Sequence, residues 1–309
     1  MIHLHPSNKM EKLNLSPASE LALSKIVLGL WRLNDMPANE LLEILHYSIN
    51  NGITSFDEAD IYGGYRSQEY LGRALKAEPS LRDAIQLVSK AGVILPGSVF
   101  TKSGIGYYKT TQQHITQSVE KTLGDMNTEY LDLLLIHRPS PLMVPEELDA
   151  TFQKLKKSGK VLHFGVSNFT PTQFDMLTQR METPLITNQI ELSVLHIAPL
   201  NDGTLDNCIK NQIKPMIWSP LAGGALFTGK TEQIHRVNGV LAEIAREHNN
   251  ATIDQIALAW LLKHPSNAIP VIGTLNKERI LSAIKSTHIE LTDEQWFRIL
   301  IASQGHPMA

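Results

Sequence analysis

The chain has 309 residues, 42% of them apolar, and its 28 basic side chains nearly balance its 31 acidic ones. A chain of this length buries a large core without disulfides or structural metals, and α/β barrels of this size are often single domains. The net charge of −3 lacks the basic excess that is typical of dedicated nucleic-acid binders. A single cysteine, Cys208, excludes an intrachain disulfide framework and suits a reducing compartment.

Neither a targeting segment nor a membrane span is expected. Residues 1–15 lack the basic start and apolar run of a signal peptide. The most apolar stretches, such as Leu131–Ile136 and Ile256–Leu262, are too short to cross a bilayer. We therefore expect a cytoplasmic protein with no membrane or nucleic-acid partner, folded as one domain over residues 1–309.

Short, continuous apolar runs alternate with amphipathic segments along the chain. Continuous apolar character predicts strands that are covered on both faces by helices. The predicted strands are Ile26–Leu30, Ile53–Phe56, Ile85–Ser89, Leu131–Ile136, Leu162–Val166, Leu185–Gln189, Pro215–Trp218 and Ile269–Ile272. The preceding segment, Glu11–Ser24, predicts a small hairpin that plugs one end of a barrel.

The segments between the strands carry apolar residues at helical spacing, which predicts amphipathic helices. They are Asn39–Asn50, Glu69–Lys76, Thr111–Leu123, Pro145–Lys157, Pro171–Arg180, Leu205–Asn211, Val237–His248, Asp254–Lys263 and Lys277–Ser286. Two of them share the long gap before the last strand, so one of the two is an insertion. A further helix, Thr292–Ala302, follows the last unit.

The strand ends are mostly separated by about the ~30 residues of one strand–helix–strand unit. Eight such units predict a (β/α)₈ TIM barrel, with extra helices at the C-terminal end. A doubly wound open sheet is the structural alternative. It is disfavoured because no G-x-G-x-x-G follows the first strand, where a dinucleotide-binding sheet requires it.

Polar residues close several predicted strands, at the end of a barrel where catalytic groups lie. Asp57, Lys90 and His137 are three of them, and Tyr62 follows in the loop after Asp57. A buried lysine loses its charge unless a carboxylate pairs with it, and Asp57 can be that partner. We expect the charged lysine to lower the pKa of Tyr62 below its usual value near ~10, which makes Tyr62 a general acid. His137 would then hydrogen-bond a substrate oxygen.

Each of these residues also has an ordinary structural explanation. Asp57 can cap a turn, Lys90 can be a solvated charge, Tyr62 can belong to a glycine-rich turn, and His137 can be a buried core histidine. Four such groups at equivalent strand ends nevertheless favour a catalytic site. A Lys90 without a carboxylate partner would instead suit a Schiff-base enzyme. The histidines are dispersed, without the paired spacing of a zinc site, so no metal is expected.

Residues 56–63, Phe-Asp-Glu-Ala-Asp-Ile-Tyr-Gly, resemble the Asp-x-Ala-x-x-Tyr-Gly signature of the aldo-keto reductases. Further segments resemble motifs of the same family in order: Ser89-Lys90, Leu131–Pro139, Gly159–Val161, Gly165–Phe169, Asn188-Gln189, Trp218–Leu221 and Pro270–Thr274. The resemblance covers roughly residues 25–290. The Tyr-Gly-Gly-Tyr and Ile-His-Arg-Pro segments are most similar to the YdhF-like branch of bacterial oxidoreductases.

The resemblance implies an NADP(H)-dependent reductase that converts a small-molecule carbonyl to an alcohol on a TIM barrel. Asp57, Tyr62, Lys90 and His137 would form the catalytic tetrad, with Tyr62 as proton donor. The residues implied at the cofactor are Gly29, Trp31, Asp57, Ser167, Asn168, Gln189, Trp218, Ser219, Pro220, Leu221, Gly223, Gly273, Thr274 and Arg279. An alternative is a cofactor-sensing regulatory subunit with the same fold.

The segment after the last predicted strand departs from the family pattern. Gly273-Thr274 stands where many members carry a Lys-Ser pair, and Ser282-Ala283 replaces a Glu-Asn pair. Arg279 is retained, and its guanidinium suits the 2′-phosphate of NADP. The substrate itself depends on variable loops, chiefly Leu95–Tyr108 and Pro139–Val144, and on the tail after Thr292.

Overall fold

A closed barrel of eight parallel strands forms the centre of the protein in a computed structural model that describes residues 10–102 and 104–308. Its strands are β3 (Val27–Gly29), β4 (Ser55–Asp57), β5 (Gln86–Ala91), β8 (Leu131–Ile136), β9 (Val161–Ser167), β10 (Leu185–Glu191), β11 (Met216–Trp218) and β12 (Ile269–Ile272). They pair in chain order, and β12 closes the ring on β3. The (β/α)₈ prediction is therefore confirmed, and the open-sheet alternative is wrong. No signal peptide is expected in residues 1–15, and residues 1–9 of this segment lie outside the described residues.

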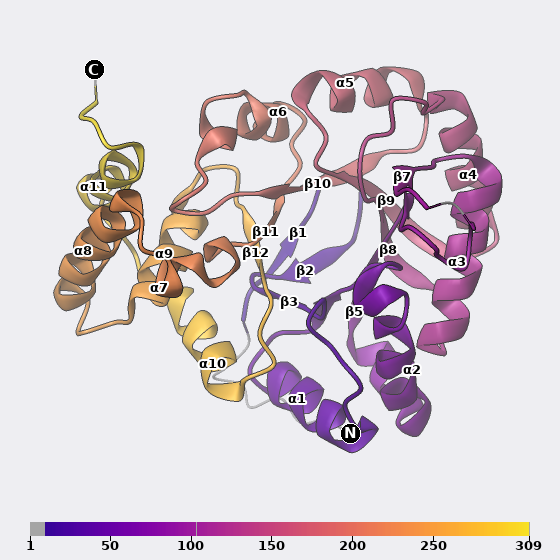
Figure 1. The fold of residues 1–309 in the computed structure, drawn as a ribbon, viewed down its shortest axis with the longest axis horizontal. Helices are drawn as coiled ribbons and strands as arrows, with labels where there is room; N and C mark the ends of the chain where they lie inside the picture. Colours follow the sequence, from indigo (N-terminus) through magenta and orange to yellow (C-terminus); the bar gives the residue numbers. More distant parts are fainter. Residues whose placement is uncertain (1–9, 103, 309) are drawn as a thin grey trace.

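Helices surround the barrel on its outer side (Figure 1). They are α1 (Ala38–Asn50), α2 (Ser67–Ala77), α3 (Gln112–Met126), α4 (Pro145–Lys157), α5 (Pro171–Arg180), α6 (Thr204–Lys210), α7 (Ala225–Thr228), α8 (Glu232–Glu247), α9 (Ile253–Lys263), α10 (Lys277–Ser286) and α11 (Asp293–Gln304). Short 3₁₀ turns add Tyr62–Gly64, Pro79–Ala84, Ala198–Leu200 and Ala222–Gly224. The helix α8 begins at Glu232 rather than Val237, because Thr231 caps it by accepting the Ile234 N–H.

The N-terminal hairpin closes one end of the barrel, as predicted. Its strands β1 (Lys12–Asn14) and β2 (Ala22–Ser24) are antiparallel. The backbone N–H of Ser24 donates to the hydroxyl of Ser55, the first residue of β4, at 2.9 Å. Apolar residues of the hairpin form one buried cluster with the residues that fill the barrel, namely Leu15, Leu21, Leu23, Val27, Val88, Leu133, Leu135, Ile186, Met216, Ile269 and Val271. The hairpin thus covers the end at which the strands begin.

A second hairpin lies in a segment for which only a loop was predicted. Its strands, β6 (Val93–Ile94) and β7 (Tyr107–Tyr108), have two residues each and pair antiparallel directly after β5. Strands of this length carry no readable periodicity. The hairpin rises from the end of the barrel where the strands finish, which is also where the predicted catalytic residues lie.

The C-terminal helices pack on one side of the barrel, where α8 and α11 lie side by side (Figure 1). The indole rings of Trp260 and Trp296 stack at 5.1 Å, and each indole N–H donates to the other residue's carbonyl oxygen at 3.1 Å. This reciprocal pair attaches α11 to α9. No helix among residues 10–102 and 104–308 is long and apolar enough to cross a membrane.

The plug gives the first testable prediction. Leu23→Ala removes a side chain with no exposed surface from the base of the barrel, so it should lower the free energy of unfolding by about 2–5 kcal/mol. The same change at Leu162, which is 38% exposed, should cost no more than ~0.5 kcal/mol. Urea unfolding of both variants measures the difference. Equal, small losses would show that the hairpin does not support the barrel.

Candidate active site

The ends of β4 and β5 bring Asp57, Lys90 and Tyr62 into direct contact. The ammonium group of Lys90 donates to Oδ2 of Asp57 at 2.6 Å and to the hydroxyl of Tyr62 at 3.1 Å. Its third bond goes to the backbone carbonyl of Glu58 at 2.9 Å. All three ammonium donors therefore have acceptors, which is the condition for burying this charge.

The Lys90–Asp57 pair is almost completely buried, with Lys90 1% and Asp57 3% exposed. Burial alone would lower the pKa of Lys90, but Asp57 and Tyr62 together outweigh it and hold that pKa above the ordinary lysine value. Lys90 therefore stays charged at neutral pH and is a poor nucleophile. This arrangement argues against the Schiff-base alternative, which requires a lysine without a carboxylate partner.

Tyr62 differs from the sequence-based expectation in one respect. Burial raises the pKa of its hydroxyl, and the nearby charge of Lys90 offsets this only in part. The expectation of a lowered pKa is therefore wrong in direction, because the depth of the phenol outweighs its proximity to the lysine. The consequence for a general acid is still favourable, since Tyr62 keeps the proton that it would donate.

His137 lies beside Tyr62 at the end of β8. The two rings meet edge to face with their centroids 6.1 Å apart. Burial, followed by the charges of Lys90 and Arg138, lowers the pKa of His137 well below 6.5, so its imidazole is neutral. Within the described part of the chain, its buried Nδ1 has no hydrogen-bond partner. The structure therefore brings all four predicted tetrad residues together.

A chain of hydrogen bonds extends from Asp57 across β9, β10 and β11. The side-chain amide of Gln189 donates to Oδ1 of Asp57 at 2.9 Å, and its backbone carbonyl accepts from the Ser167 hydroxyl at 3.0 Å. The Asn168 amide donates to Ser167 at 2.8 Å. Its oxygen accepts the indole N–H of Trp218 at 2.8 Å, which fixes the orientation of that ring. These predicted cofactor residues thus lie in one contiguous group.

The loop after β11 holds four more predicted cofactor residues: Ser219, Pro220, Leu221 and Gly223. Several of its residues have left-handed backbone angles, with φ of 50° at Ser219, 51° at Ala222, 63° at Gly223 and 101° at Gly224. Left-handed residues next to right-handed ones are the backbone pattern of many anion-binding turns. The N–H groups of Ala222 and Gly224 already donate to carbonyl oxygens within this loop, so its backbone angles, and not a set of free donors, make it a candidate for a phosphate.

Arg32, which is not among the residues predicted from sequence, joins the two loops predicted at the cofactor. Its guanidinium donates to the carbonyl oxygens of Gly273 at 3.1 Å and Gly223 at 3.2 Å. It also lies 4.5 Å over the ring of Trp31. A Cβ atom on Gly273 would lie 2.3 Å from the Trp31 indole nitrogen, so only glycine admits this packing. In the sequence, the signal that could have indicated Arg32 is a basic residue just after the first predicted strand.

The remaining predicted cofactor residues lie apart from the tetrad or in the barrel wall. Gly29 pairs with Asp57 in the wall, and a Cβ atom there would come within 3.0 Å of Val271, so strand packing explains this glycine. Thr274 accepts the Asn276 N–H at the start of α10. Arg279 lies in the first turn of α10 with an exposed side chain.

Two buried acids beside the tetrad were also missed. Glu58 is completely buried and accepts hydrogen bonds from the Ser67 hydroxyl at 2.7 Å and the Ala59 N–H at 3.2 Å. Burial raises its pKa to about 8. Asp60, which accepts from Ser118 at 2.6 Å, has its pKa raised by burial to about 7. Both lie within the motif run 56–63, but burial of a charge-bearing residue leaves no trace in sequence.

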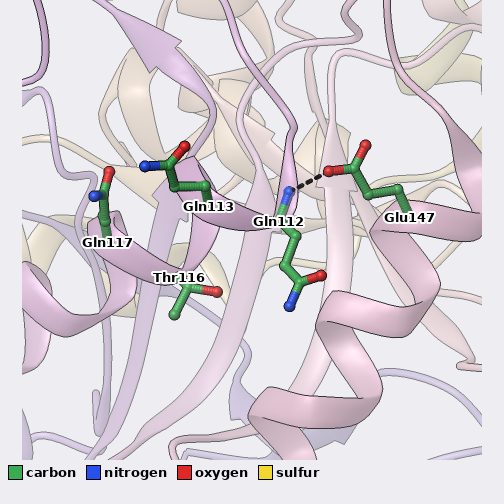
Figure 2. Close-up of a pocket in the computed structure, with 5 residues that line it drawn as sticks. All are labelled: Gln112, Gln113, Thr116, Gln117 and Glu147. Carbon is green, nitrogen blue, oxygen red and sulfur yellow. Dashed lines mark hydrogen bonds between the residues drawn. The ribbon is translucent and has the colours of Figure 1, made fainter.

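A shallow surface hollow of about 500 Å³ lies between α3 and α4 (Figure 2). Its lining residues are Gln112, Gln113, Thr116, Gln117 and Glu147. The backbone N–H of Gln112 already donates to Glu147 at 2.8 Å. No predicted site residue lines this hollow. Over the described ranges, no three His, Cys, Asp or Glu side chains gather as a metal site.

An (β/α)₈ barrel with Asp, Tyr, Lys and His side chains at adjoining strand ends is the arrangement of an aldo/keto reductase. The model of the aldo/keto reductase family matches residues 25–303, so the chain belongs to this family. The family resemblance is thereby confirmed.

The relatives include YdhF, for which the expected branch is named. The chain is 44% identical to "Uncharacterized oxidoreductase YcsN" of Bacillus subtilis and 41% identical to "Oxidoreductase YdhF" of Escherichia coli, covering 96% of this chain and 99% of each relative. It is 40% identical to a "6-dehydroglucose reductase" of Agrobacterium fabrum, over 97% of this chain and 100% of that protein. The crystal structure of the thermostable aldo-keto reductase Tm1743, in complex with the inhibitor epalrestat, aligns with a TM-score of 0.80 at 27% identity over 95% of this chain and all of that one.

Glu58 gives a prediction about stability and pH. Its folded pKa of about 8 lies above the ~4.3 of an unfolded glutamate, so the folded chain holds a proton that the unfolded chain has released. Stability therefore falls as pH rises through this window, by up to ~1.4 kcal/mol per pH unit from this group. Glu58→Gln removes the titration and should flatten the loss.

The measurement is denaturant unfolding of wild type and Glu58→Gln at about pH 5 and about pH 7.5. All other titrating groups are shared, including Asp60 with its pKa of about 7, so the double difference reports the titration of Glu58 together with its coupling to neighbouring charges. We expect the wild type to lose more stability than the variant, by at most ~3.5 kcal/mol over this range. Parallel pH profiles would contradict a neutral Glu58 in the folded chain.

Proposed function

We propose that the protein reduces the carbonyl group of a small molecule to an alcohol with NADPH, and that Tyr62 donates the proton. The contact of 3.1 Å between the charged Lys90 and the still protonated Tyr62, beside the neutral His137, is the observation that carries the proposal. NADPH, when bound, supplies the hydride to the carbonyl carbon. The family match over residues 25–303 supports a single barrel domain.

His137, Tyr62 and Lys90 have different roles in the proposed reaction at the substrate oxygen. His137 is neutral, so one ring nitrogen can donate a hydrogen bond that orients the carbonyl without competing for the proton. Tyr62 transfers its proton to that oxygen as the carbon–oxygen double bond becomes single. The phenolate that remains is stabilised by Lys90, whose charge Asp57 maintains. The proton therefore moves from Tyr62 to the product alcohol.

The structure offers groups that fit a nicotinamide dinucleotide. Ser167, Asn168 and Gln189 present hydroxyl and amide groups that match a carboxamide, and the half-buried ring of Trp218 beside them can stack on a planar ring. The left-handed backbone at Ser219–Gly224 suits the diphosphate. The exposed guanidinium of Arg279 can pair with a 2′-phosphate.

The relatives narrow the substrates to test. Relatives that are 40% and 32% identical are named 6-dehydroglucose reductases, so a sugar carbonyl belongs in the test panel. We also propose a cytoplasmic location. The single cysteine, Cys208, is buried, and burial raises its thiol pKa to about 12, which suits a permanently reduced thiol.

Tyr62→Phe tests the proposal, because it keeps the ring but removes the hydroxyl that is bonded to Lys90. General acid catalysis is typically worth ~10²–10⁴-fold, so carbonyl reduction should fall at least that far. The dissociation constant for NADPH should stay within about threefold, roughly 0.65 kcal/mol. Tyr47→Phe, on the outer helix α1, is the matched control and should keep full activity.

Two outcomes would count against this assignment. Wild-type rates in Tyr62→Phe on a good aldehyde would refute Tyr62 as the proton donor. A wild type that binds NADPH tightly but reduces nothing across a broad carbonyl panel would favour the cofactor-sensing subunit instead. In every case, turnover is measured as the loss of NADPH absorbance.

Arg279→Ala tests the cofactor preference. A charge-assisted hydrogen bond is worth ~1.5–3 kcal/mol, so the dissociation constant for NADPH should rise roughly ten- to hundredfold. The constant for NADH, which lacks the phosphate, should hardly change. Lys285→Ala, at the far end of α10, removes an equal charge and should affect neither cofactor. An equal loss for both cofactors would show that Arg279 does not contact the phosphate.

A further inference from the structure

A second tyrosine, Tyr65, ends the turn that carries Tyr62. Gly63 and Gly64 have φ of 57° and 64°, and Tyr65 follows with a φ of 71°. The left-handed region suits the two glycines but strains a residue with a side chain. Tyr65 is nevertheless only 6% exposed, so its side chain makes the contacts that offset this strain.

The hydroxyl of Tyr65 bonds to the backbone of β6 and of Leu95, the residue that follows this strand. It accepts the N–H of Leu95 at 3.0 Å and donates to the carbonyl of Val93 at 3.5 Å. The other edge of β6 pairs with β7, where Val93 lies opposite Tyr108. The phenol therefore occupies the free edge of β6 as a neighbouring strand would. Burial raises the pKa of Tyr65, so the hydroxyl keeps the proton that it donates.

The ring of Tyr65 makes a second connection to the same region. It meets Phe100 edge to face at 5.7 Å, and Phe100 meets His114 of α3 in the same way at 5.0 Å. Beyond the hairpin, the hydroxyl of Ser140 donates to the Tyr108 carbonyl at 3.4 Å. Tyr65 thus links the turn of Tyr62 to the β6–β7 hairpin, and the hairpin in turn contacts the loop after β8.

These contacts connect the turn of the proposed proton donor to β5 and β6 in a closed series of bonded segments. Tyr62 is bonded to Lys90 in β5, β6 begins three residues after Lys90, and the β6 carbonyl of Val93 accepts from Tyr65 in the turn of Tyr62. We propose that Tyr65 is a positioning residue that fixes the β6–β7 hairpin at the mouth of the barrel and so sets the binding of extended carbonyl substrates. This inference rests on the proposed reductase function.

The effect on binding should depend on how far the substrate extends from its carbonyl group toward the hairpin. A small aldehyde contacts the tetrad but does not extend to the hairpin, so a displaced hairpin leaves its reduction unchanged. A substrate with a bulky group beyond the carbonyl meets the hairpin and loses those contacts. Tyr65→Phe is the appropriate variant, because it removes both hydroxyl bonds and keeps the ring contact with Phe100.

The first measurement needs no substrate. Backbone hydrogen exchange in peptides from residues 93–100 should be about five- to tenfold faster in Tyr65→Phe, as expected for losing hydrogen bonds of ordinary strength. Exchange in α5, on another part of the barrel, should not change. Tyr70→Phe, a buried tyrosine of α2, is the matched control. Unchanged exchange in 93–100 would overturn the proposal.

The second measurement is kinetic and compares a short aliphatic aldehyde with a bulky aromatic aldehyde. In Tyr65→Phe, KM for the bulky aldehyde should rise about five- to tenfold, while kcat for both aldehydes and KM for the short one stay within twofold. A general loss of kcat would show a structural role instead and refute the proposal, as would equal KM values in variant and wild type. If the wild type reduces neither aldehyde nor a sugar carbonyl, the reductase function has failed, whereas the exchange result still decides whether Tyr65 holds the hairpin.

Discussion

One buried charge determines the chemistry of this barrel. Lys90 and Asp57 lie at 2.6 Å from each other with almost no exposure, where an unpaired charge would be very costly. The pair is tolerated because every ammonium proton has an acceptor: a carboxylate, the Glu58 carbonyl and the Tyr62 hydroxyl. Removing either partner would leave the other charge uncompensated, at a cost of about 3–5 kcal/mol.

Burial sets the protonation states around the pair, and the charge of Lys90 modifies them. Burial raises the pKa of Glu58 to about 8, so Glu58 keeps its proton although the nearby charge of Lys90 acts in the opposite direction. Burial also lowers the pKa of His137, and the charges of Lys90 and Arg138 lower it further, so its imidazole is neutral. Tyr62 is left as a protonated phenol bonded to a fixed charge. Oδ1 of Asp57 also starts the hydrogen-bond chain that ends at Trp218, so the same pair orients the groups proposed for the cofactor.

The barrel, and the meeting of the four tetrad candidates at one end of it, could be predicted from sequence because both depend on local patterns: continuous apolar runs, their spacing and the polar residues at or just after the ends of several runs. The sequence could not show how deeply a side chain is buried, or which residues far apart in the chain are in contact. The pKa of Tyr62 was predicted in the wrong direction because burial, not proximity to Lys90, decides it. Arg32 was missed because its acceptors are backbone carbonyls 241 and 191 residues away. The β6–β7 hairpin was missed because two-residue strands have no periodicity.

Asp57 keeps Lys90 charged inside the barrel, and an NMR titration of ¹³Cε-labelled lysine measures this charge directly. We expect the Lys90 signal to show no deprotonation while exposed lysines titrate near pH ~10.4, and we expect Asp57→Asn to shift the pKa of Lys90 downward. Lys90→Met identifies the signal by its disappearance. A wild-type Lys90 that loses its proton before the exposed lysines do would show that Asp57 does not hold the lysine in its charged form.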